Sequence, residues 1–178
     1  MFLKGLTDKF KHKSGVKFLR DQLQKTPPVP KRTKGITSIG CIIDLDKVTN
    51  PEQFFEFVDE YNLRPNAVKI IGYKSYSDKN SPYATPVFSD NDLGWKGEIV
   101  NSYALEFLSR DYDLLVSYYD EENLLLQLMT VKTGARVKVG FSEIDPKLND
   151  LILAIPLNDF EIFKLELKKY LKVLNEIE

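Results

Sequence analysis

The chain has 178 residues, 43% of them hydrophobic, and a formal net charge of −1. This length suits one domain with a sizeable core. No apolar run approaches the ~18 residues of a membrane span, and lysines recur through the first 17 residues, where a secretory signal would be apolar. We therefore expect a cytoplasmic protein. The single cysteine excludes an internal disulfide.

Charge is divided unevenly along the chain. Residues 1–34 hold ten Lys or Arg and two Asp, a net of +8, which leaves 15 Lys or Arg and 24 Asp or Glu, a net of −9, for residues 35–178. Such asymmetry is evidence about partners. We expect residues 1–34 to bind an anionic surface, either a membrane leaflet or RNA. The basic side chains assigned to this contact are Lys4, Lys9, Lys11, Lys13, Lys17, Arg20, Lys31, Arg32 and Lys34.

The basic segment is predicted to begin as amphipathic helix. Its apolar residues fall on two helical stripes, rotated from each other. Ser14 and Gly15 stand between the stripes and predict a break into two short helices. Three prolines in residues 26–34 predict an extended linker. The first stripe comprises Phe2, Leu3, Leu6 and Phe10, and the second comprises Val16, Leu19 and Leu23.

The pattern after residue 35 predicts a βαβ unit. Residues 38–45 form an isoleucine-rich apolar run, typical of a strand buried on both faces. The sequence Asn50-Pro51-Glu52-Gln53 predicts a capped helix start. We expect this helix to carry Phe54, Phe55, Val58 and Tyr61. Residues 67–72 then predict a second, parallel strand.

The remaining chain continues to alternate between the two kinds of element. Residues 73–97 are irregular and aromatic, which predicts a functional loop or a hidden hairpin. A helix is expected at 101–109, a strand at 113–119, and a helix capped by residues 120–122. Strands at 135–141 and 150–155 stand only eight residues apart, so they are either antiparallel or joined by a cramped turn. Asn158 and Glu161 predict a capping box for a final helix.

These elements predict an α/β domain over residues 35–178. We expect a three-layer, Rossmann-like, doubly wound and mostly parallel sheet of about five strands. Residues 1–34 would form a basic amphipathic helical extension and Pro-rich linker beside it.

Several catalytic classes are disfavoured by what the chain lacks. His12 is the only histidine and lies in the basic segment, so a Ser-His or Cys-His nucleophile system or a Cys/His zinc site is not expected. The turn after the first strand is Asp44-Leu45-Asp46-Lys47, acidic where a phosphate-binding loop is glycine-rich. We expect no metal and no cofactor, and Cys41 is interpreted as a core residue.

Carboxylates follow two of the predicted strands. Asp44 and Asp46 end the first, and Asp120 and Glu121 end the third. At a shared sheet edge they could hold Mg²⁺ or act as acid and base, or they could simply favour helix N-termini. Trp95 either covers a pocket or packs its loop on the sheet. The candidate ligand-binding residues are Asp44, Lys74, Trp95, Asp120 and Glu121.

Residues 107–141 (FLSRDYDLLVSYYDEENLLLQLMTVKTGARVKVGF) carry a resemblance. The segment resembles an uncharacterised α/β family of Bacteroidota, a domain of unknown function, and the likeness extends through KGITSIGCIIDLD, VKIIGYKSY and DLGWKGE. The segment is also similar to the N-terminal half of heptosyltransferase-like glycosyltransferases, through residues 112–114 and 135–141. This second likeness implies a Rossmann-like sheet. Those enzymes use another domain for the nucleotide-sugar, for which 178 residues leave no room.

The sequence therefore leaves alternative functions open. The first is a non-enzymatic adaptor or assembly subunit whose basic segment docks on a membrane or on RNA, at the ribosome for example, while its acidic body binds a protein partner. In the membrane case it would be peripheral at the inner membrane. The alternative is a domain that binds a small molecule or nucleotide-sugar at the strand ends, as a degenerate glycosyltransferase-like half. A purely structural subunit of a larger assembly is the third.

Overall fold

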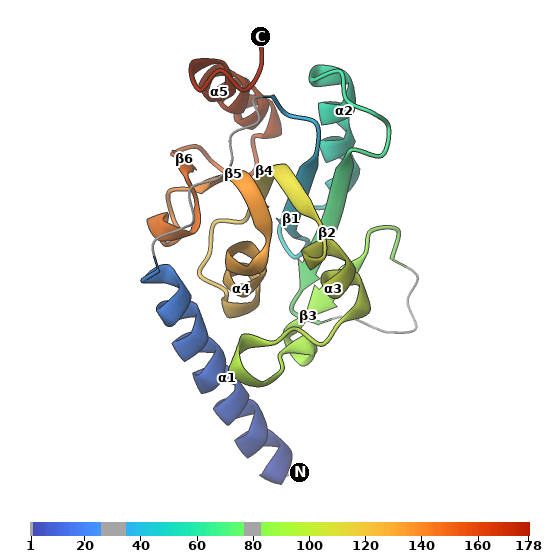
Figure 1. Cartoon of the computed structure of the whole chain (residues 1–178). Helices are drawn as coiled ribbons and strands as arrows, with labels where there is room; N and C mark the ends of the chain where they lie inside the picture. Colours follow the sequence, from blue (N-terminus) through green and yellow to red (C-terminus); the bar gives the residue numbers. More distant parts are fainter. Residues whose placement is uncertain (1, 26–34, 77–82) are drawn as a thin grey trace.

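A parallel sheet forms the centre of the molecule (Figure 1). The computed structural model describes residues 2–25, 35–76 and 83–178, and gives the backbone alone for residues 2–4. In these ranges six strands pair in the order β3-β2-β1-β4-β5-β6, all parallel. They are β1 (Ile39–Asp44), β2 (Val68–Lys74), β3 (Val87–Ser89), β4 (Asp111–Tyr118), β5 (Gly134–Phe141) and β6 (Leu151–Leu153).

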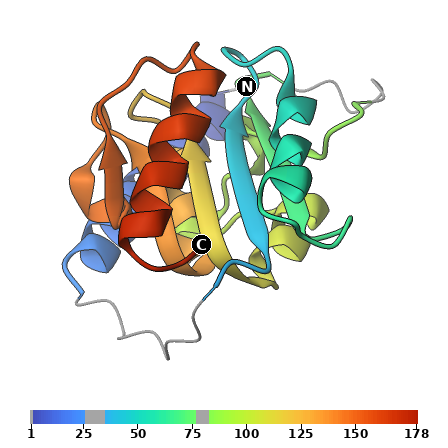
Figure 2. The ribbon, with the colours of Figure 1, turned by 90° about the horizontal axis from the view of Figure 1, so that it is seen from above.

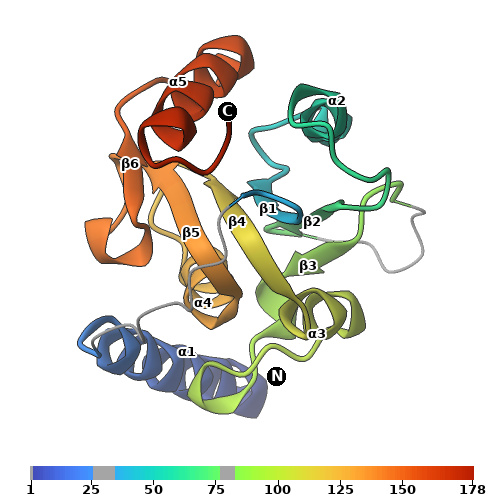
Figure 3. The same cartoon turned by 45° about the horizontal axis from the view of Figure 1, so that its top comes forward.

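Helices cover both faces of this sheet, as the sequence predicts. On one face lie α2 (Glu56–Glu60) and α5 (Phe160–Val173), which Figure 2 shows in front of the strands. On the other face lie α3 (Ser102–Leu108) and α4 (Leu124–Lys132). Helix α1 (Phe2–Leu23) packs outside α4, on the side of the sheet away from α5 (Figure 3). The fold is therefore α/β with covered faces, and every residue of β1 is buried.

The core on the α5 side is aromatic. The Tyr118 ring, 1% exposed, packs edge-on against Phe54, Phe141 and Phe163, with centroid distances of 4.8, 5.0 and 4.9 Å. Edge-to-face packing of this kind adds about 0.5–1.5 kcal/mol per pair beyond the burial of apolar area. Its hydroxyl donates to the Leu157 carbonyl at 2.6 Å, so the buried polar atom is satisfied.

The predicted break in the N-terminal helix is wrong. Helix α1 runs without interruption through Ser14 and Gly15. A Cβ atom at Gly15 would lie 3.2 Å from Leu124 Cδ2 and 3.6 Å from Leu93 Cδ1. The glycine is therefore a point where α1 packs closely on the body. The Ser14 hydroxyl donates to the Lys11 carbonyl at 2.8 Å, which is compatible with a continuing helix.

Strand number differs from the prediction, and the structure decides the direction of the last two strands. The irregular stretch 73–97 contains β3, a three-residue parallel edge strand in place of the hairpin considered. The last two strands are parallel, and the 3₁₀ helix Pro146–Leu148 lies between them. The cramped turn is therefore the correct alternative, and the sheet has six strands where about five were expected.

Two helix caps lie one residue beyond their predicted positions, and a third helix begins at the predicted residue, Pro51, but without the predicted cap hydrogen bond. Asn50 makes no side-chain cap, and the segment begins as a 3₁₀ helix over Pro51–Phe55 before α2. Phe55, one of the predicted apolar residues of this helix, is 47% exposed, whereas Phe57 in α2 is fully buried. Helix α4 is capped by Asn123, whose side chain accepts from the backbone of Leu125 and Leu126, and residues 120–122 stand outside it. Helix α5 is capped by Asp159 in place of Asn158.

Candidate functional site

The strand order reverses between β1 and β4, so the loops after these strands diverge at the carboxyl edge of the sheet. In open parallel sheets this switch point is the usual place for a ligand. A cavity of about 490 Å³ lies there, lined among others by Lys47, Gln53, Tyr118, Asp120 and Phe160. Residues after β1, at the end of β4 and at the start of α5 form its walls.

Lys47 organises the acidic residues at this edge. Its ammonium lies 2.5 Å from Asp120 Oδ1 and 2.6 Å from Glu121 Oε1. Desolvation opposes the charge on Lys47, but these two hydrogen bonds outweigh it and raise the lysine pKa. The carboxylates of Asp120 and Glu121 thus converge on a cation from the chain itself. Lys47 was not among the predicted site residues, although it directly follows the acidic turn.

Asp44 has a local structural role at the same edge. The side chain is 6% exposed, and its Oδ1 accepts from the Asp46 backbone at 3.0 Å. Its carbonyl accepts from the backbone of Lys47 and Val48. Burial raises the pKa of the Asp44 carboxyl, against the hydrogen bond from Asp46, which lowers it. The residue therefore closes the turn that presents Lys47.

Lys74, the last residue of β2, lies beside Asp46 in the turn that follows β1. Its ammonium lies 3.9 Å from Asp46 Oδ1, and the Ser75 backbone donates to Asp46 Oδ2 at 2.8 Å. A second cavity of about 490 Å³ is lined by Lys74, Leu45 and Pro51 among others. Among the described residues no group of three or more His, Cys, Asp or Glu side chains is arranged to hold a metal ion.

Trp95 stands apart from these strand-end residues. It begins the 3₁₀ helix Trp95–Gly97, which contacts α1. The Lys96 backbone donates to the Ser14 hydroxyl at 2.9 Å, and Trp95 is itself 53% exposed. The structure therefore brings Asp44, Lys74, Asp120 and Glu121 to one edge, and places Trp95 beside the N-terminal helix.

Helix α1 docks on the body through one face of its C-terminal half. Leu19 is buried there, and the Phe18 ring packs under the Lys132 ammonium, 4.1 Å from its centroid. A Cβ at Gly97 would lie 3.0 Å from the Phe18 ring, so the loop approaches the helix closely. Leu23 packs against the same cluster. The second predicted apolar stripe is thus in large part a contact with the body, although Val16 is 44% exposed.

Leu6 and Phe10, the two residues of the first stripe whose side chains are described, point the other way. At roughly 100° per residue, Leu6 and Phe10 lie on the opposite side of α1 from Leu19. Their side chains are 47% and 52% exposed. Figure 1 shows this N-terminal half extending past the rest of the molecule. Between its inner side and the loops after β3 and β4 lies an open cavity of about 820 Å³, lined by Asp8, His12 and Asn123 among others.

Basic side chains accompany this exposed apolar stripe. Lys9, Lys13, Lys17 and Arg20 are all exposed on α1, and Lys11 is partly buried. The Lys4 side chain, Lys31, Arg32 and Lys34 lie outside the described residues. We call the exposed group Leu6, Lys9, Phe10, Lys13, Lys17 and Arg20 the outer face of α1.

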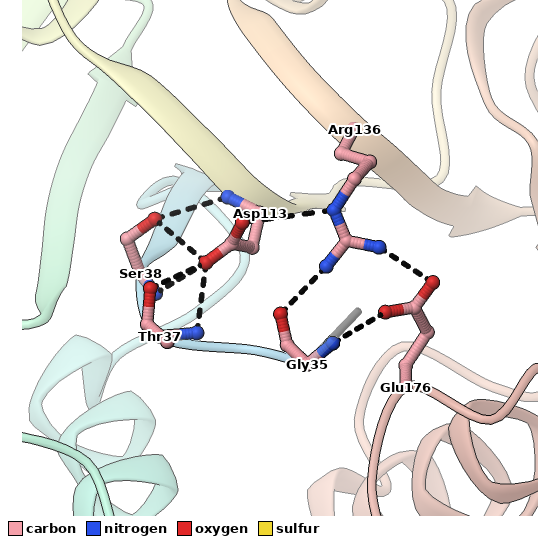
Figure 4. Close-up of polar contacts among 6 residues, drawn as sticks. All are labelled: Gly35, Thr37, Ser38, Asp113, Arg136 and Glu176. Atoms are coloured by element: carbon pink, nitrogen blue, oxygen red, sulfur yellow. Dashed lines mark hydrogen bonds and ion pairs between the residues drawn. The ribbon is translucent and has the colours of Figure 1, made fainter. Parts of the chain in front are cut away.

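A second polar cluster, at the opposite edge of the sheet, was missed by sequence reasoning (Figure 4). The Arg136 guanidinium donates to the Gly35 carbonyl at 2.7 Å and to Glu176 Oε1 at 2.5 Å, and its Nε lies 3.6 Å from Asp113 Oδ1. Asp113 Oδ2 accepts from both the backbone and the hydroxyl of Thr37. These contacts join the start of the body to β4, β5 and the C-terminal segment, which is a structural role.

Comparison with known proteins identifies a family and no activity. No curated protein and no solved structure matches the chain. The resemblance to glycosyltransferases therefore gains no support. A family described as a family of unknown function, DUF6913, matches residues 11–174, a range that includes the docked half of α1 and nearly all of the body. The chain therefore belongs to the DUF6913 family.

Proposed function

We propose that the protein is a non-enzymatic adaptor that docks on an anionic membrane surface through the outer face of α1. The observation that carries this proposal is the orientation of Leu6 and Phe10. They lie on the far side of α1 from Leu19 and Gly15 and are about half exposed. A helix with exposed apolar side chains among lysines is typical of segments that lie in a membrane interface.

The charges favour the same partner. Each Lys or Arg close to an anionic leaflet contributes about 1 kcal/mol, so Lys9, Lys13, Lys17 and Arg20 together supply a useful part of the binding free energy. RNA would use these charges equally well, but it would leave Leu6 and Phe10 without a role. No helix among the described residues is long and apolar enough to cross a membrane, so the attachment we propose is peripheral.

The body is the second half of the adaptor. Residues 35–178 carry a net charge of −9, which repels an anionic leaflet and favours a basic or polar protein partner. We place the protein at the cytoplasmic side of the inner membrane. The strand order and the covered faces support a Rossmann-like form of the fold, with residues 1–34 as its basic extension.

Co-sedimentation with vesicles tests the proposal. We expect the protein to pellet with vesicles that contain phosphatidylglycerol, and not with purely zwitterionic ones. Leu6→Ser/Phe10→Ser should lose the binding that survives high salt. The matched control is Tyr103→Ser/Leu105→Ser, which changes two residues of similar exposure on α3 and should bind normally.

Charge reversal measures the electrostatic contribution to vesicle binding separately from the apolar one. Lys13→Glu/Lys17→Glu should weaken binding at low salt, whereas Arg110→Glu, on the body, should not. If the wild type ignores anionic vesicles and instead binds RNA through Lys13 and Lys17, the membrane proposal is wrong and RNA is the partner.

One observation favours a second candidate, a small-molecule site at the switch point. The cavity of about 490 Å³ beside Lys47 has the position of ligand sites in doubly wound sheets and a volume within their range. Thermal shift with nucleotides and nucleotide-sugars tests it. A ligand that stabilises the wild type and fails to stabilise Gln53→Ala would support this function, and no shift with any of them would count against it.

A further inference from the structure

Helix α5 has a second apolar face that the core does not use. Its inner positions Phe163, Leu167 and Leu171 are fully buried. On the opposite side, Leu165 and Val173 are 66% and 72% exposed, and Ile162 is 41% exposed. We call Ile162, Leu165, Lys169 and Val173 the outer stripe of α5.

The outer stripe is continuous along the helix. Its members are spaced by three or four residues, so each lies next to the following one on the helix surface. Lys169 is its only polar member, and the Lys169 ammonium is held against Glu166 at 2.5 Å. Single exposed apolar residues need no explanation, but a contiguous exposed apolar patch indicates a contact surface.

The two halves of α5 carry different charges around the outer stripe. The first half of α5 carries Glu161, Glu166 and Lys164, whose ammonium pairs with Glu56 and Glu161, and the second half carries Lys168, Lys169 and Lys172 and no acidic residue. A parallel copy of this helix would place the three lysines of one second half beside those of the other. An antiparallel copy would place Glu161 and Glu166 against the lysines of the second half, so the surface is complementary to itself.

We propose that the outer stripe of α5 is the interface of a homodimer in which two copies of α5 pack antiparallel. A twofold axis between Leu167 and Lys168 sets Ile162 opposite Val173 of the second copy. The same axis sets Glu166 opposite Lys169. Apolar residues thus meet apolar residues across the contact. Glu166 and Lys169, which pair within each chain, also lie opposite Lys169 and Glu166 of the second copy.

The contact is small. Helix α5 has 14 residues, and one helix face buries less than the ~800 Å² per partner of a standard interface. The dimer is therefore weak and dissociates on dilution. It does not depend on α1, which lies on the other side of the sheet (Figure 3).

Sedimentation velocity over a range of protein concentrations tests the proposal without any membrane. The full-length wild type should shift from monomer to dimer as concentration rises. Leu165→Glu should lower the association constant at least about tenfold. Leu105→Glu is the matched control, because Leu105 is 54% exposed on another helix, and it should dimerise as the wild type does. Circular dichroism melts confirm that both variants are folded.

Charge reversal tests the antiparallel arrangement. Lys169→Glu should weaken the dimer, because it places Glu opposite Glu166 of the second copy. Glu166→Lys/Lys169→Glu should restore the wild-type association, since every cross-pair is again opposite in charge. A wild type that stays monomeric at all concentrations, or a dimer unaffected by Leu165→Glu, would overturn the proposal. Failure of the double variant to recover would overturn the antiparallel pairing.

Discussion

Arg136 shows how a single side chain connects distant parts of the chain. Its side chain is 9% exposed and those of its partners Asp113 and Glu176 are 19% and 12% exposed. Its Nε has no hydrogen bond among the described residues, so the ion pair with Asp113 at 3.6 Å is its contact there. Removing one member of a buried ion pair leaves the other charges desolvated and uncompensated.

We therefore expect Arg136→Ala to lower the free energy of unfolding by about 3 kcal/mol or more. Arg110→Ala removes an arginine whose pair with Glu106 is exposed, and should cost less than about 1 kcal/mol. Urea denaturation of both variants measures the difference. If the two cost the same, the cluster in Figure 4 contributes no more than a surface pair.

The Asp113 carboxylate makes part of this stability depend on pH. Burial opposes its charge, but hydrogen bonds from Thr37 and Ser38 and the charge of Arg136 outweigh burial and lower its pKa. A lowered pKa means that the folded state binds the proton less tightly than the unfolded state. The stabilisation is thus complete above the ordinary aspartate pKa and is lost as pH falls through the lowered value.

Asp113→Asn should accordingly reduce stability at neutral pH and flatten its dependence on pH below about 4. Urea midpoints measured for wild type and variant across this range provide the test. Asp111→Asn is a suitable control, because Asp111 is an exposed aspartate on the same strand. Parallel curves for wild type and Asp113→Asn would contradict this account.

Residues of this kind could not be predicted from the sequence. Arg136 and Asp113 fall in strands whose apolar pattern was recognised, but their partners Gly35 and Glu176 lie 101 and 40 residues from Arg136. No local sequence pattern predicts that charged residues of β4 and β5 will contact the start of the body and the C-terminal segment. By contrast, Asp44, Asp120 and Glu121 could be placed at one edge, because parallel strands end at the same edge of a sheet.

At the scale of elements, α1 depends on the absence of a side chain at Gly15. The nearest side-chain atoms would stand 3.2–3.7 Å from a Cβ there, so a larger residue has no room. We expect Gly15→Leu to separate α1 from α4 while the body stays folded. Gly5→Leu is the control, because nothing lies within 4 Å of a Cβ at Gly5.

Trp95 provides the measurement. It is the only tryptophan and lies in the 3₁₀ helix that α1 contacts. Undocking of α1 by Gly15→Leu should change its emission and speed proteolysis within α1, and Gly5→Leu should do neither. If Gly15→Leu leaves both unchanged, the helix tolerates a larger side chain at this contact, and the contact is looser than the distances indicate.

The elements themselves were largely predictable where they are long and buried. β1, β2 and β4 are largely apolar runs, β5 alternates apolar and polar residues, and the inner face of α5 has clear helical spacing. The errors have physical reasons. Ser14 and Gly15 predict a helix break, whereas Gly15 serves a close packing contact. β3 has only three residues, too few for a pattern. Asn123 and Asp159 each stand one position beyond the predicted caps, in sequences where neighbouring residues are equally suited to capping.

The whole molecule has its two proposed contact surfaces on opposite sides. Helix α1 belongs to the core cluster beneath α3 and α4, and α5 belongs to the cluster on the other face. Figures 1 and 3 show the two helices at opposite ends of the layered structure. Two copies joined through α5 therefore direct their α1 helices away from each other. Such a dimer cannot place both outer faces on one flat membrane.

A dimer of this shape should link two membranes. We expect the wild type to cluster vesicles that contain phosphatidylglycerol, which raises their turbidity at protein concentrations where the dimer forms. Leu165→Glu should still co-sediment with these vesicles but should not cluster them. Leu6→Ser/Phe10→Ser should lose clustering at high salt together with binding.

Binding without clustering by the wild type would mean that α5 does not join copies on the membrane, even if α1 docks as proposed. Clustering that persists in Leu165→Glu would instead show that one chain contacts two membranes. The net charge of −9 on residues 35–178 makes that outcome physically unfavourable, because the body repels a second anionic surface. Attachment to two anionic vesicles is therefore expected to require two basic helices, and the proposed α5 dimer would supply the second.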